Sequence, residues 1–341
     1  MFSFRMQSKT ILPAVAAIVS FAAMAEAQSL DWIKPSLASL PAARGDAGMA
    51  YDVATHSTVL FGGGNGNILK PTIVYGDTWI WRNGWSQQSP AASPSARGGP
   101  GMAYDPTTGT VVLFGGYNVD LTLLNDTWTW DGVTWTEQFP LVSPPARSFN
   151  SQEMAYDTAT GTVVLFGGYG NGTVFDDTWE WDGRAKTWTQ QFPASSPSPR
   201  GCALAYDRTA RQIVVFGGDN GGGDCCRVYY GDTWTWDGMN WTQQFPASAP
   251  SARTDVPMAY DTDIGKVVLF GGFSVPGQGL SDTWDWDGST WSQRQTPTNP
   301  GGRWSAAMDF DPVSKGLVLF GGELTGDPFA NDTWLFIPVK Q

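Results

Sequence analysis

A sixfold repeat of about fifty residues is the feature that most constrains the fold of this 341-residue chain. The tripeptide Phe-Gly-Gly recurs at intervals of 50 to 54 residues, and an Asp-Thr-Trp tripeptide follows each copy. The six Phe-Gly-Gly motifs begin at Phe61, Phe114, Phe166, Phe216, Phe270 and Phe320. Self-similarity at this period indicates an array in which each unit buries its apolar faces against its neighbours.

The residue pattern of each unit predicts four antiparallel strands. In the second unit, Met-Ala-Tyr-Asp at 102–105 is the first strand, and a Gly-containing turn follows it. The apolar run at 111–114 suits a second strand that is covered on both faces. The third strand alternates Thr and Trp and ends at Asp131-Gly132, a dipeptide that favours a tight hairpin turn. The fourth strand carries Trp135 and leads through a Pro-rich segment to Arg147.

A second invariant spacing predicts how the array closes. The fourth-strand Trp precedes an Arg by 12 residues in every unit, but the last unit ends after Trp334 and Phe336 without a fourth strand. Near the N-terminus, Trp32 lies 12 residues before Arg44. We therefore expect an N-terminal strand to complete the last unit and close a ring. The fold class is all-β, with six blades of four antiparallel strands in a single domain over 28–341.

The recurring Val-Val-Leu-Phe-Gly-Gly, Asp-Thr-Trp, lone Trp and Pro-x-Arg motifs resemble the kelch repeat, including the central domain of galactose oxidase. The resemblance covers about residues 30 to 337 and implies a six-bladed kelch-type β-propeller. Kelch propellers include protein-interaction modules, galactose oxidase, sialic-acid mutarotases and plant specifier proteins, so the resemblance indicates a fold more narrowly than a function.

The first 27 residues have the layout of a secretory signal peptide. Arg5 and Lys9 precede an apolar stretch at 11–24, and Ala25-Glu26-Ala27 matches a small-x-small cleavage site. A membrane anchor is the alternative, but this stretch is shorter than the roughly 20 residues that span a bilayer. We therefore expect a secreted or periplasmic protein with no membrane span in its mature chain.

The charge and composition of the chain limit the classes of ligand and cofactor that it can be expected to bind. The net charge is −12 and the sequence has no Lys/Arg cluster, which argues against nucleic acid as a partner. A copper-radical site like that of galactose oxidase requires two His ligands, and this chain has only His56. We expect His56 to occupy a positive-φ turn position. We expect no metal and no cofactor, and a monomer that binds a glycan or a protein ligand.

The loops that follow each Gly-Gly pair are the expected recognition surface, because they vary in length and carry aromatic residues. They should share one end of the ring with the segments that enter each first strand, and those segments carry polar residues that the repeat does not explain. The candidate ligand-binding residues are Phe149, Asn150, Trp304, Tyr117, Tyr169 and Tyr230. The alternative is that the aromatic rings tuck under neighbouring loops and that the polar residues are merely solvated.

Three carboxylates at this end are candidate catalytic residues. Asp46, Glu153 and Asp255 lie in alternate units and could converge on the axis, where like charges would raise one pKa and create an acid/base pair. A recognition module is the favoured function, and a cofactor-independent sugar mutarotase or epimerase that uses these carboxylates is the alternative.

Two further predictions concern repeated and unpaired residues. An Arg occurs at the same place in every unit, so we expect it to hold blades together, against a repeat Asp. Cys202 is expected to form a disulfide with Cys225 or Cys226, which would clasp the long loop of the fourth unit.

Overall fold

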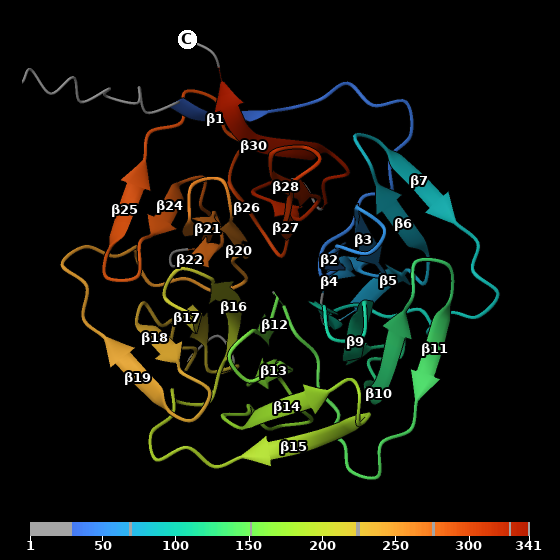
Figure 1. The fold of residues 1–341 in the computed structure, drawn as a ribbon. Helices are drawn as coiled ribbons and strands as arrows, with labels where there is room; N and C mark the ends of the chain where they lie inside the picture. The colour runs from blue at the N-terminus through green and yellow to red at the C-terminus, as the bar shows by residue number, and fades with distance from the viewer. Residues whose placement is uncertain are drawn as a thin grey trace, which may run out of the picture.

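A computed structural model of the chain describes residues 29–67, 70–150, 152–222, 226–274, 277–326 and 329–339. These residues form a ring of six four-stranded antiparallel sheets around a central axis (Figure 1). The predicted signal peptide at 1–27 lies outside the described residues. No helix among the described residues has the length and apolar character needed to cross a membrane.

The six blades follow one another along the chain, each with its strands ordered from the axis outward. Blade 1 contains β2 (Gly48–Asp52), β3 (Ser57–Phe61), β6 (Thr78–Trp81) and β7 (Trp85–Gln88). Blade 2 contains β8 (Gly101–Asp105), β9 (Thr110–Tyr117), β10 (Leu123–Trp130) and β11 (Trp135–Gln138). Blade 3 contains β12 (Met154–Asp157), β13 (Thr162–Phe166), β14 (Thr178–Asp182) and β15 (Thr187–Gln191).

The remaining blades repeat the pattern. Blade 4 contains β16 (Gly201–Asp207), β17 (Gln212–Asp219), β18 (Thr233–Trp236) and β19 (Trp241–Gln244). Blade 5 contains β20 (Met258–Asp261), β21 (Lys266–Phe270), β24 (Thr283–Trp286) and β25 (Trp291–Arg294). Blade 6 contains β27 (Ala307–Asp311), β28 (Gly316–Phe320), β30 (Thr333–Val339) and β1 (Ser29–Ile33).

Three short two-stranded pairs lie outside the blades: two are hairpins within loops that follow Gly-Gly pairs, and the third joins such a loop to the segment that enters β27. They are β4 (Gly64–Asn67) with β5 (Lys70–Val74), β22 (Phe273–Ser274) with β23 (Gln278–Gly279), and β26 (Arg303–Trp304) with β29 (Glu323–Leu324).

Blade 6 confirms the predicted closure of the ring. Strand β1 lies beside β30 and pairs antiparallel with it (Figure 1). Within this pair, Trp32 lies opposite Phe336. The indole Nε1 of Trp32 donates a 2.9 Å hydrogen bond to the hydroxyl of Thr283 in blade 5. The two ends of the chain therefore share one sheet, which leaves no unclosed gap between the first and last blades.

The same contact between neighbouring blades recurs around the whole ring and explains two of the repeat motifs. In every blade the fourth-strand Trp donates 2.8–2.9 Å from its indole to the Thr of Asp-Thr-Trp in the preceding blade. The ring of that Trp also packs on the Phe of Phe-Gly-Gly, with centroids 4.9–5.3 Å apart. The core therefore lies between blades, as six separate apolar clusters.

A buried ion pair also recurs in every blade, as predicted. The repeated Arg side chains are at most 1% exposed, and each lies 2.5–2.7 Å from the Asp of the next Asp-Thr-Trp. Each Arg also donates to the carbonyl of the first Gly of the Gly-Gly pair, as Arg44 does to Gly62 at 2.9 Å. Burial alone would raise the pKa of Asp77, but the hydrogen bonds and charge of Arg44 bring it below its usual value.

The Gly-Gly pairs are required by the close approach of these Arg segments. Gly62 has a φ of +71°, and a Cβ there would lie 2.4 Å from the carbonyl oxygen of Arg97. Only glycine tolerates both the positive φ and the close contact.

Candidate functional site

The loops after the Gly-Gly pairs and the segments that enter each first strand share one end of the propeller, as predicted. Gly45 pairs with Gly64, Gly98 with Tyr117, and isolated bridges repeat this contact in other blades. We call this the Gly-Gly-loop end. The opposite end carries the turns between first and second strands, and we call it the turn end.

Three aromatic side chains of the Gly-Gly-loop end lie over the Arg side chains of the Arg–Asp pairs. The rings of Tyr75, Phe175 and Tyr230 lie 3.8–3.9 Å from the guanidinium carbons of Arg44, Arg147 and Arg200. This geometry is a cation–π contact at short range, and it screens the buried ion pairs from solvent. Tyr230, a predicted ligand-binding residue, is therefore half-buried in a structural contact.

Two predicted ligand-binding residues are too deeply buried for that role. Phe149 is fully buried and contributes to the core between blades 2 and 3. Its ring fills the space beside Gly168, where a Cβ would lie 2.8 Å from the ring. Tyr117 is 5% exposed, and its hydroxyl donates to Asp46 at 3.1 Å. The prediction of an open aromatic surface was therefore wrong for these two residues.

The axis at this end holds a group of interacting carboxylates. The pKa of Asp255 is raised to about 8 by burial and then by the charges of Asp219 and Asp46, against a hydrogen bond from Asn150. Burial likewise raises the pKa of Asp46 to about 6. The structure thus places Asp46, Asp255 and Asn150 close enough to influence one another, whereas the sequence prediction grouped Asp46 and Asp255 with Glu153.

Glu153 belongs to the same axial region. Its side chain is fully buried, and its charge contributes, after burial and after other carboxylates, to the raised pKa of Tyr169. The hydroxyl of Tyr169 donates to Asp219 at 2.9 Å, so this predicted ligand-binding residue is also engaged within the protein.

Asp219 is a site residue that the sequence prediction missed. It directly follows the Gly-Gly pair of blade 4, where blades 1, 2, 3 and 5 carry Gly64, Tyr117, Tyr169 and Phe273. Blade 6 carries the other carboxylate at this position, Glu323. Comparing the repeats at this one position would have found both residues.

Trp304 lies at the edge of the carboxylate group. It is half-buried, its ring packs edge-on against Phe273 at 4.9 Å, and its indole donates to Glu323 at 3.1 Å. Burial and the charge of Asp46 raise the pKa of Glu323. Trp304 therefore links two loops of this end and keeps part of its surface open to solvent.

A chain of backbone hydrogen bonds holds the axial segments in place. Phe149 donates to Gly99, Gly99 to Asp46, Asp46 to Ser305 and Ser305 to Asp255, at 2.8–3.0 Å. Asp46, Asp255 and Ser305 have φ between 52° and 53°, in the left-handed region that few residue types adopt. Asp46 and Asp255 are thus held in place by these hydrogen-bonded segments around the axis, which we call the collar.

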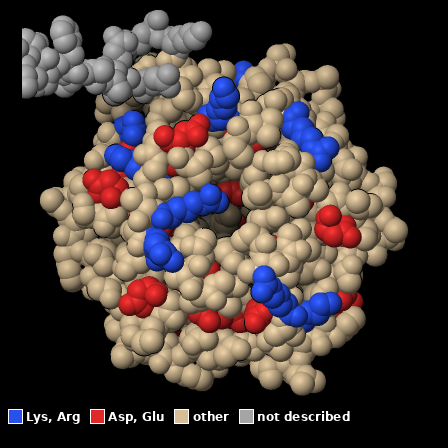
Figure 2. All heavy atoms as spheres, viewed as in Figure 1, with Lys and Arg blue, Asp and Glu red and all other residues tan. Residues whose placement is uncertain are grey.

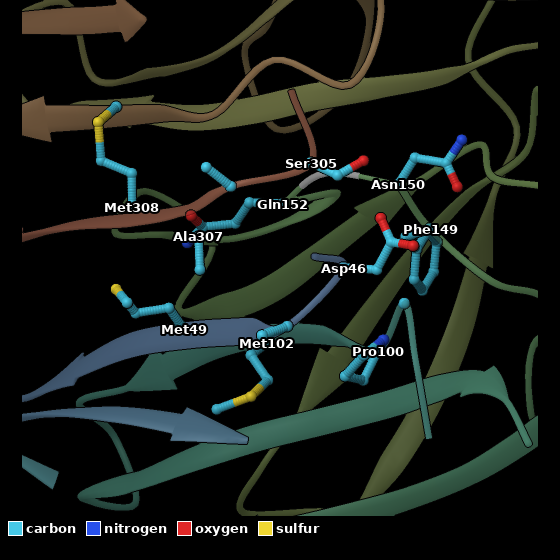
Figure 3. A pocket seen from close by; sticks show the side chains of 14 residues that line it. Asp46, Met49, Pro100, Met102, Phe149, Asn150, Gln152, Ser305, Ala307 and Met308 are labelled. Carbon is cyan, nitrogen blue, oxygen red and sulfur yellow. The ribbon is translucent and has the colours of Figure 1, made fainter. Parts of the chain in front are cut away.

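The collar leaves little room at the axis. The cavity beside Asp46 has a volume of about 20 Å³, roughly enough for one water molecule. Figure 3 shows Asp46, Asn150 and Ser305 gathered on one side of it, with Met49, Met102 and Met308 around the rest. A much larger cavity, about 570 Å³, lies toward the turn end, and Gln152 lines both.

The remaining site predictions concern metal and cysteine chemistry. Among the described residues, no group of three or more His, Cys, Asp or Glu side chains is arranged to hold a metal ion. His56 occupies its predicted turn position, with a φ of 51°. Cys202 has a free thiol and is buried against the blade 3–4 core, whereas Cys226 is exposed and Cys225 lies outside the described residues. The predicted disulfide of Cys202 is therefore not formed.

The raised pKa of Asp255 predicts that part of the stability is lost as pH rises. Because its folded pKa is about 8 and its ordinary value 3.8, the folded carboxyl keeps a proton that the unfolded chain has released. This contribution is complete below about pH 4 and is lost through about pH 8. Asp255→Asn should therefore raise the free energy of unfolding at about pH 9 by roughly 2 kcal/mol or more, with little effect at about pH 4.

Urea unfolding of the variant and the wild type at both pH values measures this difference. The exposed Asp176, at the same end, supplies the control Asp176→Asn, which should leave the pH dependence unchanged. A wild-type pH dependence that persists in Asp255→Asn contradicts the assignment.

Comparison with known proteins agrees with this architecture. The family described as the KLHDC2/KLHL20/DRC7 Kelch-repeats domain matches residues 48–244, more than half of the chain. The chain is 31% identical over 188 residues to acyl-CoA-binding domain-containing protein 5 of Arabidopsis thaliana. The matched region covers 53% of this chain and 28% of that protein.

It is also 29% identical over 184 residues to tRNA wybutosine-synthesizing protein 4 of Emericella nidulans, covering 45% of this chain and 16% of that protein. The chain thus spans less than a third of the length of either relative. With its six four-stranded blades and the match over 48–244, the chain belongs to the kelch-repeat β-propeller family of the KLHDC2/KLHL20/DRC7 type.

Proposed function

We propose that this propeller is a recognition module that binds a positively charged segment of a protein ligand through its Gly-Gly-loop end. Kelch-type propellers are typically protein-interaction modules. The observation that carries the charge preference is the convergence of Asp46, Asp219 and Asp255, whose mutual repulsion is felt in the raised pKa of Asp255.

The charge balance of this end favours a cationic ligand. Glu153 and Glu323 add two carboxylates to the three at the axis. Arg227 faces them at 3.6 Å from Asp219, and its side chain is 39% exposed. A Lys or Arg side chain of a ligand would therefore meet a negative potential here, and the net charge of −12 would steer it toward the protein.

The shape of this end favours a protein over a small molecule. The axial cavity beside Asp46 holds about 20 Å³, which is far below the roughly 300–1,000 Å³ of small-ligand sites. A glycan ligand would have to lie on the loop surface. A protein segment can cover the loops broadly and insert only one cationic group toward the axis.

A sugar mutarotase or epimerase remains the second candidate function. The observation that favours it is the pair of carboxyl groups whose pKa values are about 6 for Asp46 and about 8 for Asp255. Two such groups are suited to act as base and acid near neutral pH. The small volume beside Asp46 weighs against it, because a sugar ring does not fit there without movement of the collar.

We also propose that the protein is exported. The layout of residues 1–27 supports a secreted or periplasmic location, and a recognition module that works outside the cytoplasm suits a chain of this kind.

Binding to an array of immobilised peptides tests the proposal. Peptides that contain Lys or Arg should bind the purified protein, and matched neutral or acidic peptides should not. Binding should weaken as salt rises, because the contact is electrostatic. At about pH 9, where the Asp255 carboxyl is ionised, Asp255→Asn should weaken it about tenfold through loss of a charge-assisted contact.

Asp176→Asn is the matched control, because Asp176 is exposed at the same end but does not lie in the axial group. Equal binding of acidic and basic peptides, or binding unaffected by Asp255→Asn, would contradict the proposal. Anomer interconversion of free sugars that Asp255→Asn abolishes would favour the enzyme instead.

A further inference from the structure

A large cavity lies at the end of the propeller opposite the proposed protein-binding surface. Its volume is about 570 Å³, and inner-strand residues of all six blades line it. It includes the turn residues Val53 and His56, so it opens toward the turn end. Figure 2 shows the ring hollowed at its centre, with basic side chains beside the opening. Its size falls within the range of about 300–1,000 Å³ that is common for small-ligand sites.

Small side chains at one repeat position create this space. The second residue of the Met-Ala-Tyr-Asp motif lines the cavity, and in five blades it is alanine. These alanines are Ala50, Ala103, Ala155, Ala205 and Ala259. In blade 6 the same position holds Asp309, and the tyrosine that should follow is Phe310. The repeat therefore places a single carboxylate in an otherwise apolar ring of methyl groups.

Asp309 is built into the cavity wall with acceptor capacity to spare. One oxygen accepts a 2.6 Å hydrogen bond from the backbone of Tyr51, and the other accepts 2.7 Å from that of Phe310. A carboxylate offers about four lone-pair sites, so roughly two remain. Among the described residues, no Lys or Arg lies within ion-pair distance of it. Burial raises the pKa of Asp309 to about 6, against the charge of Arg208.

Aromatic rings surround this carboxylate. The third residue of the same motif is aromatic in every blade and lines the cavity, as Tyr51, Tyr104, Tyr156, Tyr206, Tyr260 and Phe310. Several hydroxyls bridge to neighbouring blades, as Tyr260 does to Thr209 at 2.7 Å, which fixes the ring positions. Rigid aromatic faces of this kind pack well against the C–H faces of a sugar ring.

We propose that the cavity at the turn end binds a neutral sugar. Asp309 would accept hydrogen bonds from the hydroxyl groups of the sugar, and the circle of aromatic side chains would enclose the sugar ring. Arg208, an exposed cation at the mouth, opposes a cationic amine as the ligand. Asp309 opposes an anionic one. A ligand that is uncharged, rich in hydroxyl donors and apolar on its ring faces satisfies both. This site is separate from the Gly-Gly-loop end, and it stands or falls independently of the protein ligand proposed there.

Isothermal titration with a defined panel tests the proposal. The panel contains glucose, galactose, mannose and N-acetylglucosamine as neutral sugars, glucuronate as an anion and choline as a cation. At least one neutral sugar should bind, and Asp309→Asn should weaken it at least about tenfold. Asp263→Asn, the same substitution at an exposed residue of the turn end that does not line the cavity, should leave the affinity unchanged.

A second variant keeps the test decisive even if Asp309→Asn fails to fold. Thr262 is exposed and lines the mouth, so Thr262→Trp should obstruct entry and reduce sugar binding without disturbing the core. Binding of choline in preference to the sugars, binding of no panel member, or sugar binding that survives both Asp309→Asn and Thr262→Trp would each overturn the proposal.

Discussion

Replacing Arg147 with alanine is expected to lower the free energy of unfolding by about 3–5 kcal/mol. Its guanidinium is fully buried, lies 2.5 Å from Asp177, and donates to the carbonyls of Pro145 and Gly167 at 3.0 and 2.8 Å. Removing the guanidinium would leave Asp177, whose side chain is 14% exposed, with a largely buried and uncompensated charge. It would also leave two carbonyls and the ring of Phe175 without their partner.

Arg184→Ala in the same blade is the matched control, because Arg184 is exposed on a turn. Its effect should stay within about 0.5 kcal/mol. Arg147→Lys should lie close to the alanine variant, since an ammonium cannot reproduce the two parallel bonds of the planar guanidinium. Urea unfolding measures all three. A loss in Arg147→Ala no larger than in Arg184→Ala would show that the pair contributes little, and that the repeated Arg is kept for another reason.

The repeat made most of the fold predictable, because each structural contact recurs six times. The Arg–Asp pair and the closing strand follow from spacings that hardly vary along the chain, and the Trp–Thr bond found in the structure recurs with the same repeat. A position that is the same in every blade is constrained by blade packing, so its environment can be inferred from the pattern.

The candidate site was less predictable, because it depends on how loops fold over the scaffold. Tyr75 and Tyr230 stand in variable loops, yet their rings lie over arginines more than twenty residues away in sequence. No spacing rule encodes that contact. The aromatic residues of the loops therefore suggested an exposed aromatic surface. In the structure several of these rings are packed within the protein, and carboxylates lie at the axis instead.

Residues that depart from the repeat indicate the candidate sites best. The sequence prediction identified some of these residues and missed others. Trp304, Asp46 and Asp255 were identified as departures, and the structure places all three at the Gly-Gly-loop end. Asp219 and Asp309 are departures of the same kind, but they fall inside the strands, where a single changed residue is easily assigned to packing. Whether such a residue faces a cavity depends on three-dimensional volume, which the sequence does not state.

Replacing Trp32 with alanine is expected to cost about 3–5 kcal/mol of unfolding free energy, although the residue lies on the short N-terminal strand β1. Its side chain is 1% exposed and packs on Phe270 and Phe336 with ring centroids 4.9 and 5.0 Å away. Its indole bond to Thr283 joins blade 6 to blade 5. The variant would lose this packing and leave a buried hydroxyl without its donor.

Urea unfolding of Trp32→Ala beside Ile33→Ala tests the closure of the ring most directly. Ile33 is the next residue on β1 and is 39% exposed, so its replacement should cost about 0.5 kcal/mol or less. If the N-terminal strand completes blade 6, Trp32→Ala should unfold at clearly lower urea than both Ile33→Ala and the wild type. If the two variants unfold together with the wild type, β1 does not hold the ring shut, and the assignment of the two ends to two binding sites loses its foundation.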